Sequence, residues 1–235
     1  MNITFFTHVR PFDDVFGPIQ MAALSSWAYA YDEVQIVCFG PDTEHYNVIR
    51  ELGYIPAICE TNEYHQSDFG SMFRGVERDY NSSYYCEVSS DIILSHFGFL
   101  MPQLRHWEAP FVIGQRLDYD PQTQVYTPHP PSAVDWFLYR KGQLPAIDIP
   151  PFSIGRTAYD NWMVWAARYR WKLQVLDATS IVMAIHHNHP HPEHGNKAAM
   201  HQSRERTRNL ELARATGCDR WCGIETAEVK LGVNP

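Results

Sequence analysis

Short apolar runs alternate with amphipathic segments through the first part of the chain. Runs rich in β-branched and aromatic residues lie at residues 3–7, 34–40 and 55–59, and such runs favour buried strands. Helical patterns occupy the intervals at residues 16–31 and 42–52. Strands and helices that alternate in this way form parallel sheets with right-handed crossovers. This region is therefore predicted to be a Rossmann-like nucleotide-binding half.

The same kind of pattern continues toward the C-terminus. Further strands are expected at residues 84–88, 110–116, 135–140 and 173–176, with an apolar run at 181–185. Helices are expected at residues 68–80, 96–105, around 160–171 and 196–216, and residues 117–131 are expected to form a loop. We find no internal repeat and no linker, so residues 1–235 are interpreted as a single domain.

Composition narrows the class of protein. The 235 residues are 45% hydrophobic and 14% aromatic, which is enough for a sizeable core, and the net charge is −8. An acidic chain is unsuited to nucleic acid, whose binding proteins present a basic face. No apolar run approaches the roughly 20 residues of a transmembrane segment, and the N-terminus lacks the features of a signal peptide. With an odd number of cysteines, five, we expect a reducing, cytoplasmic location.

Acidic and hydroxyl side chains follow the expected strand at residues 84–88. Glu87, Ser89 and Asp91 alternate along an extended segment and therefore share one face. A carboxylate at the end of a central strand is suited to a Mg²⁺ ion that is shared with a diphosphate. The alternative is that Asp91 caps a helix that starts near Ile92.

Histidines follow the apolar run at residues 181–185. Five of them, His186, His187, His189, His191 and His194, fall within nine residues. Imidazole is the commonest metal ligand in proteins, and Mn²⁺ accepts it more readily than Mg²⁺ does. The alternative is a solvated loop with nonspecific affinity for metals. A structural zinc site is not favoured, because no cysteine pair supplies further ligands.

Four blocks resemble a known family. They read VIGQRLDYD (residues 112–120), VDWFLYRKG (134–142), IPPFSIGRTAYDNW (149–162), and DAT with HHNH (177–179 and 186–189). Their sequence and order are similar to those of GT-A-like nucleotide-diphospho-sugar transferases of plants, algae, bacteria and large viruses. Residues 7–12, 20–27 and 89–94 extend the similarity over nearly the whole chain. The resemblance implies an α/β fold of the GT-A, Rossmann-like type, with a mixed, mostly parallel sheet flanked by helices.

The family resemblance also implies a metal site. Asp91 matches the last acid of the family's metal-binding motif at the strand end, and His186 and His189 match its C-terminal histidines. This chain departs from the pattern at Ser89, where the family often has Asn, and at His187, where it usually has Gln. Pro190 and Pro192 are further departures. The implied cofactor is Mn²⁺ or Mg²⁺, held by Asp91 with His186 or His189.

On this basis the chain is expected to be a glycosyltransferase that moves a sugar from a nucleotide-sugar donor to a glycan or another hydroxyl acceptor. The expected donor-binding residues are Thr7, Arg10, Asp68, Gly70, Ser89, Ser90, Asp91, Gln115, Arg116 and Asn161. Arg156 and the cation are expected to stabilise the diphosphate leaving group. Asp160 or Asp135 is expected to face the acceptor and, in an inverting reaction, to act as general base. For Asp160, the alternative is a helix cap.

Two other functions remain open at this point. A nucleotide-sugar-binding module without catalysis is favoured by the incomplete acid pair at Ser89 and Asp91. A metallohydrolase built on the histidine cluster is the second, although it leaves the N-terminal half unexplained. Acceptor recognition is expected in residues 117–131 and in the C-terminal tail.

Overall fold

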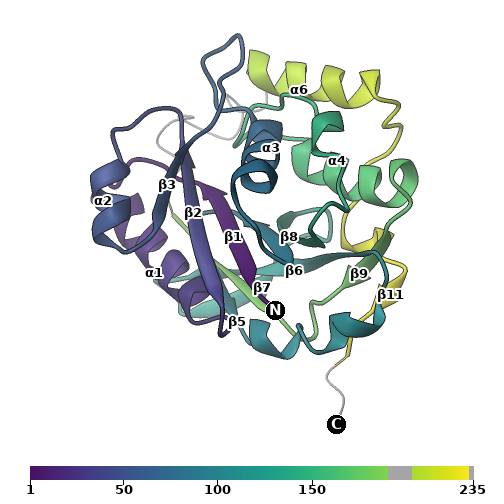
Figure 1. The fold of residues 1–235 in the computed structure, drawn as a ribbon, viewed down its shortest axis with the longest axis horizontal. Helices are drawn as coiled ribbons and strands as arrows, with labels where there is room; N and C mark the ends of the chain where they lie inside the picture. The colour runs from purple at the N-terminus through teal and green to yellow at the C-terminus, as the bar shows by residue number, and fades with distance from the viewer. Residues whose placement is uncertain (190–202, 233–235) are drawn as a thin grey trace.

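A twisted mixed sheet forms the centre of the protein (Figure 1). The computed structural model describes residues 1–189 and 203–232. In spatial order the sheet contains β11 (Val229–Lys230), β9 (Gln174–Asp177), β6 (Pro110–Asp120), β8 (Val134–Arg140), β4 (Tyr84–Val88), β1 (Ile3–His8), β2 (Val34–Gly40) and β3 (Ile55–Ile58). Only β8 runs antiparallel to its neighbours, β4 and β6; the other adjacent pairs on this path are parallel. The sheet is therefore mixed and mostly parallel.

Helices cover both faces of this sheet, as Figure 1 shows. On one face lie α1 (Phe16–Ala28) and α2 (Tyr46–Glu51), and on the other lie α3 (Phe69–Asp79), α4 (Tyr159–Trp165) and α6 (Arg204–Ala215). Successive strand residues serve the two cores in turn: Phe5 packs with Trp27 of α1, and Phe6 packs with Phe73 of α3. Strands buried on both faces lose the alternation of polar and apolar residues, which is why they read as continuous apolar runs.

Short helical turns complete the chain. They comprise η1 (Phe97–Phe99), η2 (Gln103–His106), η3 (Ala146–Asp148), η4 (Ala166–Arg170, a π-helical extension of α4) and η6 (Ile224–Thr226). No helix in the described part of the chain is long and apolar enough to cross a membrane.

A smaller set of strands continues from the second half of β6. There β6 pairs with β7 (Val125–Pro128) on one side and with β10 (Met183–His187) on the other, and β10 in turn pairs with β5 (Ile92–Ser95). The change of partners follows a register shift between Ile113 and Gln115. Gly114 lies at this irregularity, and a Cβ there would be 2.6 Å from the Trp136 ring. The bulge therefore needs glycine, and it redirects β6 toward β10.

The elements at residues 3–7, 34–40, 55–59 and 84–88 are confirmed to within a residue or two. Three predictions were wrong. Residues 96–105 form the two short turns η1 and η2, not one helix, and residues 117–131 contain the end of β6 and all of β7, not a loop. Asp91 caps no helix near Ile92, because Ile92 begins strand β5.

The helix predicted at residues 196–216 is described only from residue 203 onward. The last helix begins at Arg204, where the Ser203 hydroxyl accepts from the Arg206 amide at 3.2 Å. The earlier part of the predicted helix, residues 196–202, lies outside the described residues.

The hairpin formed by β6 and β7 was missed because its alternating sequence carries many polar residues, and these read as a loop.

Candidate active site

A cavity of about 200 Å³ opens at the carboxyl ends of β1 and β4. In the sheet, β1 lies between β4 and β2, so the chain extends the sheet from β1 in both directions. Ligands of open α/β sheets bind at such a point, where the strand order reverses. Because β8 is antiparallel to β4, it starts where β4 ends, and the Ser89 amide donates to the Asp135 carbonyl at 3.0 Å. The lining comprises Thr7, His8, Arg10, Phe69, Glu87, Ser89, Ser90, Asp91, Arg116, Asp135, Ile154, Gly155, Tyr159 and His186.

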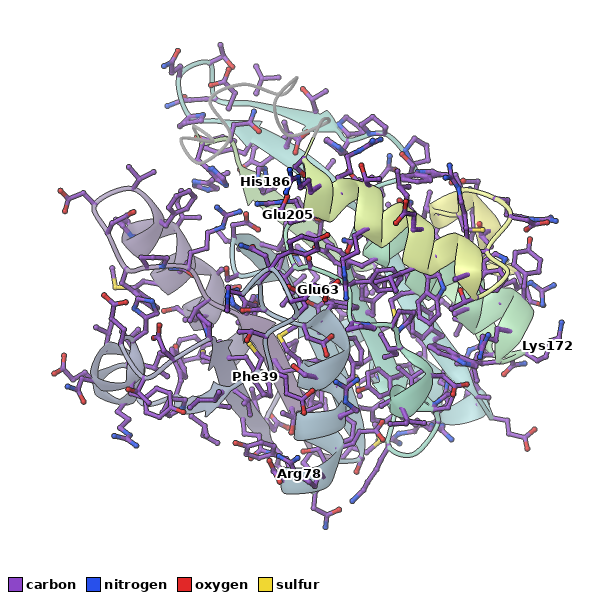
Figure 2. The ribbon with its side chains drawn as sticks, turned by 90° about the horizontal axis from the view of Figure 1, so that it is seen from above. Phe39, Glu63, Arg78, Lys172, His186 and Glu205 are labelled. Atoms are coloured by element: carbon purple, nitrogen blue, oxygen red, sulfur yellow. The ribbon has the colours of Figure 1, made fainter. Side chains whose placement is uncertain are left out.

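Asp91 and two histidines form a candidate metal centre beside this cavity. Strand pairing places Ile92 opposite His186, so the residue before β5 meets the end of β10. The Asp91 Oδ2 atom lies 3.6 Å from His186 Nε2 and 3.3 Å from His189 Nε2. One ligand atom from each of the three residues can be chosen so that all lie within 4.8 Å of one another. Figure 2 labels His186, at the junction of the smaller strands with the body of the protein.

The donor set of this centre fits a divalent transition metal. One carboxylate and two imidazoles suit Mn²⁺ better than Mg²⁺, which prefers oxygen ligands. Burial alone would raise the pKa of Asp91, but the adjacent His186 and His189 imidazoles outweigh burial and hold that pKa well below its usual range. The carboxylate is therefore ionised and ready to bind a cation at neutral pH.

The histidine cluster predicted from the sequence is divided by the structure. His186 and His189 face Asp91, whereas the His187 ring packs on Tyr119, with ring centroids 5.0 Å apart. Side chains alternate along a strand, so neighbours at 186 and 187 point to opposite faces. His191 and His194, like Pro190 and Pro192, lie outside the described residues.

Two carboxyl groups, Glu87 and Asp135, line the cavity, and a third, Asp160 of α4, lies outside the lining but close enough for its charge to act on Glu87. Glu87 is 5% exposed, and burial, followed by the charges of Asp135 and Asp160, raises its pKa well above the usual range. Burial also raises the pKa of Asp160, to about 7, and the charge of Asp135 adds to this effect. Asp160 lies in the first turn of α4, where its carboxylate accepts from the Asn161 amide.

Asp135 differs from the other two carboxyl groups because it has a cation beside it. Arg116 Nη1 lies 3.3 Å from Asp135 Oδ2. Burial raises the pKa of Asp135, and the Arg116 charge opposes that rise. Asp135 is thus ion-paired, while Asp160 has a pKa close to neutrality.

A second hollow, of about 290 Å³, adjoins the cavity near the end of β2. His8, Arg10, Ile154 and Gly155 line both spaces, and Arg156 lines the second. Ser67 Oγ is 2.7 Å from His8 Nε2. Burial, followed by the charges of Arg10 and His45, lowers the pKa of His8 to about 4, so this imidazole is neutral at pH 7. The two hollows together offer an elongated site with a neutral histidine and an arginine where they meet.

Comparison with solved structures supports the architecture, although the sequence matches no family model and no curated protein. The S. aureus TarS fragment 1–349 in complex with UDP-GlcNAc superposes with a TM-score of 0.59 at 10% identity, covering 92% of this chain. Glucosyl-3-phosphoglycerate synthase from Mycobacterium tuberculosis, in complex with Mn²⁺, UDP and phosphoglyceric acid, gives a TM-score of 0.55 at 11% identity. The fold is that of the GT-A glycosyltransferases.

The structural match covers different shares of the TarS fragment and of the synthase. The match covers 66% of the TarS fragment, while it covers 93% of this chain and 78% of the synthase. A second complex of the TarS fragment, with UDP, gives a TM-score of 0.55 at 12% identity and covers 91% of this chain and 70% of the fragment. The expected fold class is confirmed.

Four of the residues predicted to bind the donor are absent from the lining of the cavity at the ends of β1 and β4, and they have structural roles instead. Asp68 accepts from the Gly70 amide at 2.8 Å and pairs with Arg74 at 2.7 Å. A Cβ at Gly70 would lie 2.8 Å from the Ile149 carbonyl oxygen. The Gln115 side chain donates to the His129 carbonyl oxygen. The Asn161 amide donates to the Ser132 and Cys222 carbonyl oxygens at 2.6 and 2.7 Å.

Sequence reasoning left several lining residues unassigned. His8 follows Thr7 at the end of β1, and Tyr159 precedes Asp160, so each is adjacent to an assigned residue. Glu87 was recognised on the strand face that it shares with Asp91 but was given no role. The period of two along β4 was the signal for Glu87. Asp118 lies beside His186 and not in the cavity lining, and the sequence carried no signal for it beyond the resemblance block.

Proposed function

We propose that this protein transfers a sugar from a nucleotide-diphospho-sugar to a hydroxyl group of a glycan or small-molecule acceptor, assisted by a divalent cation. The observation that carries the proposal is the Asp91–His186–His189 centre, located at the carboxyl edge of a GT-A fold beside a cavity. Related folds have been crystallised with UDP-GlcNAc and with Mn²⁺ and UDP, which supports the same ligand class here.

The donor would extend across the two adjoining hollows. The nucleoside would occupy the second hollow, which His8 and Arg10 help to line, and the diphosphate would lie where the two hollows meet, between Arg156 and the segment from Ser89 to Asp91. When bound, the cation would neutralise the diphosphate charge as the sugar leaves. The guanidinium of Arg10 already stacks on Phe16, with 4.8 Å between its central carbon and the ring centroid, which holds it at the end of β1. Thr7, at the same strand end, lines the cavity beside it.

The acceptor would meet the carboxyl side of the cavity. A general base works best when its pKa lies near the operating pH, and the pKa of Asp160 is about 7. Asp135 is paired with Arg116 at 3.3 Å, which favours a role in positioning. We therefore assign Asp160 the task of accepting the proton of the attacking hydroxyl in an inverting reaction. Arg156, on the donor side, would stabilise the leaving diphosphate.

Calorimetry with a panel of nucleoside diphosphates, with Mn²⁺ and with a chelator, tests the donor site directly. At a hundred times the dissociation constant, a bound nucleotide should add about 2.7 kcal/mol to the free energy of unfolding. Transfer or donor hydrolysis, followed by nucleotide release, then tests catalysis. Binding without either reaction would mean a nucleotide-sugar-binding module. Metal-dependent hydrolysis without nucleotide binding would mean a metallohydrolase. Failure of every nucleotide to bind would overturn the proposal.

A further inference from the structure

Asp118 and His186 are direct neighbours in the parallel pairing of β6 and β10. Residues opposite each other in a sheet project to the same face, so the backbone itself brings these two side chains together. The His186 ring lies between two carboxylates: its Nε2 atom is 3.6 Å from Asp91 Oδ2, and its Nδ1 atom is 3.4 Å from Asp118 Oδ1. Only the first of these carboxylates belongs to the candidate metal centre.

The Asp118 carboxylate is itself held from two sides. Arg116 Nε is 3.0 Å from Oδ1, and His129 Nδ1 is 2.5 Å from Oδ2. Asp118 is 20% exposed and Arg116 is 18% exposed. Arg116 lies in β6 and His129 directly follows β7, so the hairpin of β6 and β7 fixes the position of the carboxylate. A carboxylate anchored in this way is suited to orienting a neighbouring ring.

The Nδ1 atom of His186 faces Asp118 without being hydrogen-bonded to it. It is buried and makes no hydrogen bond to any residue that the structure describes. An imidazole that binds a metal through Nε2 carries its proton on Nδ1, and that proton needs an acceptor. Asp118 Oδ1, at 3.4 Å, becomes that acceptor after a small rotation of the ring.

We propose that Asp118 is a positioning residue, which orients His186 so that its Nε2 lone pair points toward Asp91 and the cation. This inference rests on the proposed function. Asp118 touches neither the donor nor the cation; it acts through the imidazole ring. Partners of metal-bound histidines typically contribute 10- to 100-fold to metal affinity. The hairpin of β6 and β7 thereby becomes part of the support of the metal centre.

Titration of the full chain with Mn²⁺ alone, followed by electron paramagnetic resonance, tests the inference without any assay of activity. We expect Asp118→Ala to weaken Mn²⁺ binding about 10- to 100-fold. The matched control is Asp120→Asn, which removes one negative charge two residues further along β6. Asp120 is half-buried as a residue, and its carboxylate accepts from the Gln122 amide at 2.8 Å. This control should leave the Mn²⁺ affinity within about threefold of the wild type, because a charge in contact with solvent is screened by water and salt.

A double-mutant cycle separates positioning from a general effect on the fold. In a His186→Ala background, Asp118→Ala should cause no further loss of Mn²⁺ affinity, because the ring through which it acts is gone. An equal loss in both backgrounds would overturn the positioning role. If Asp118→Ala does not fold, as judged by circular dichroism, the cycle is run with Asp118→Asn, which keeps the shape of the side chain.

The same titration distinguishes two kinds of failure. A wild-type protein that binds no Mn²⁺ contradicts both the metal centre and the role of Asp118. Wild-type binding that is weakened by Asp91→Asn but unchanged by Asp118→Ala leaves the metal centre standing and overturns the role of Asp118 alone.

Discussion

The His189 Nε2 atom lies 3.3 Å from the Asp91 carboxylate, although 98 residues separate the two in the sequence. Antiparallel pairing of β5 with β10 creates this contact, since Asp91 precedes one strand and His189 follows the other. The buried His189 side chain also packs edge-on against Phe16 of α1, with ring centroids 5.0 Å apart. The candidate metal centre thus joins the first helix, the segment after β4 and the end of β10.

Asp91→Asn should abolish the metal dependence of nucleotide binding. The amide keeps the size of the side chain but loses the negative charge that a cation needs. Calorimetry should show nucleoside diphosphate binding stimulated by Mn²⁺ in the wild type and the same weak binding with Mn²⁺ or chelator in the variant. Asp79→Asn, which removes an exposed carboxylate at the end of α3, should behave as the wild type. Equal wild-type affinities in Mn²⁺ and in chelator would remove the cation from the proposed mechanism.

Asp160→Asn should fold and bind the donor nucleotide but lose turnover by a factor of about 10²–10⁴, the usual cost of losing a general base. Asp135→Asn is the informative comparison, because that carboxylate is paired with Arg116 at 3.3 Å. We expect it to lower the melting temperature as well as turnover, since Arg116 loses a partner. Initial rates measure the turnover of both variants, and thermal melts measure their melting temperatures. Near-normal turnover of Asp160→Asn would return the base assignment to Asp135.

The rate of transfer should rise with pH up to neutrality. Burial, followed by the charge of Asp135, raises the pKa of Asp160 to about 7, and only the ionised form accepts a proton. Turnover should therefore increase about tenfold per pH unit well below pH 7 and level off above it. A pH–rate profile at saturating donor measures this limb. A wild-type rate that is flat between about pH 5 and pH 8 would be incompatible with the assignment.

The same ionisation should appear in stability, with the opposite sign. Between its ordinary pKa of 3.8 and the raised value of about 7, Asp160 is protonated in the folded state and ionised in the unfolded state. The folded state then binds more protons, so the contribution of this group to the free energy of unfolding falls as the pH rises through that window. Denaturant titrations of wild type and Asp160→Asn should differ more at pH 8 than at pH 4, in favour of the variant.

Asn161→Ala should destabilise the fold and leave donor binding unchanged. Its side chain donates to the Ser132 and Cys222 carbonyl oxygens at 2.6 and 2.7 Å, and removing it strands two acceptors in a buried region. The expected cost is about 1–3 kcal/mol, seen as a drop of about 2–4 °C per kcal/mol in melting temperature. A large loss of nucleotide affinity without a change in melting temperature would instead place Asn161 in the donor site.

Gly114→Ala should lower the free energy of unfolding substantially, although it adds only one methyl group. The added Cβ would lie 2.6 Å from the ring of Trp136, which is fully buried. Overpacking of this kind costs about 1–3 kcal/mol. Gly40→Ala is the control, because the nearest atom to its added Cβ is 3.6 Å away. If the two variants melt alike, the close approach of β6 to Trp136 does not constrain the bulge.

Several features of this protein were readable from local sequence. The strands β1, β2 and β4 are short apolar runs because both of their faces are buried, and a run of that kind is visible without any knowledge of neighbours. Period-two spacing also placed Glu87, Ser89 and Asp91 on one face, and all three line the cavity. Residue type made His186 and His189 candidate metal ligands, and the resemblance to a known family pointed to the same two residues.

Tertiary structure decided which of these residues meet. The sequence indicated five histidines as one cluster, but alternation along β10 sends His186 toward Asp91 and His187 toward Tyr119. Asn161 reads as a ligand-binding residue, yet its side chain donates to the carbonyl oxygens of Ser132 and Cys222, which are distant in the sequence. The pairing of β10 with β5 and β6, after the bulge at Gly114, places Asp118 beside His186. Such register is set by packing between distant segments, so no local pattern of residues encodes it.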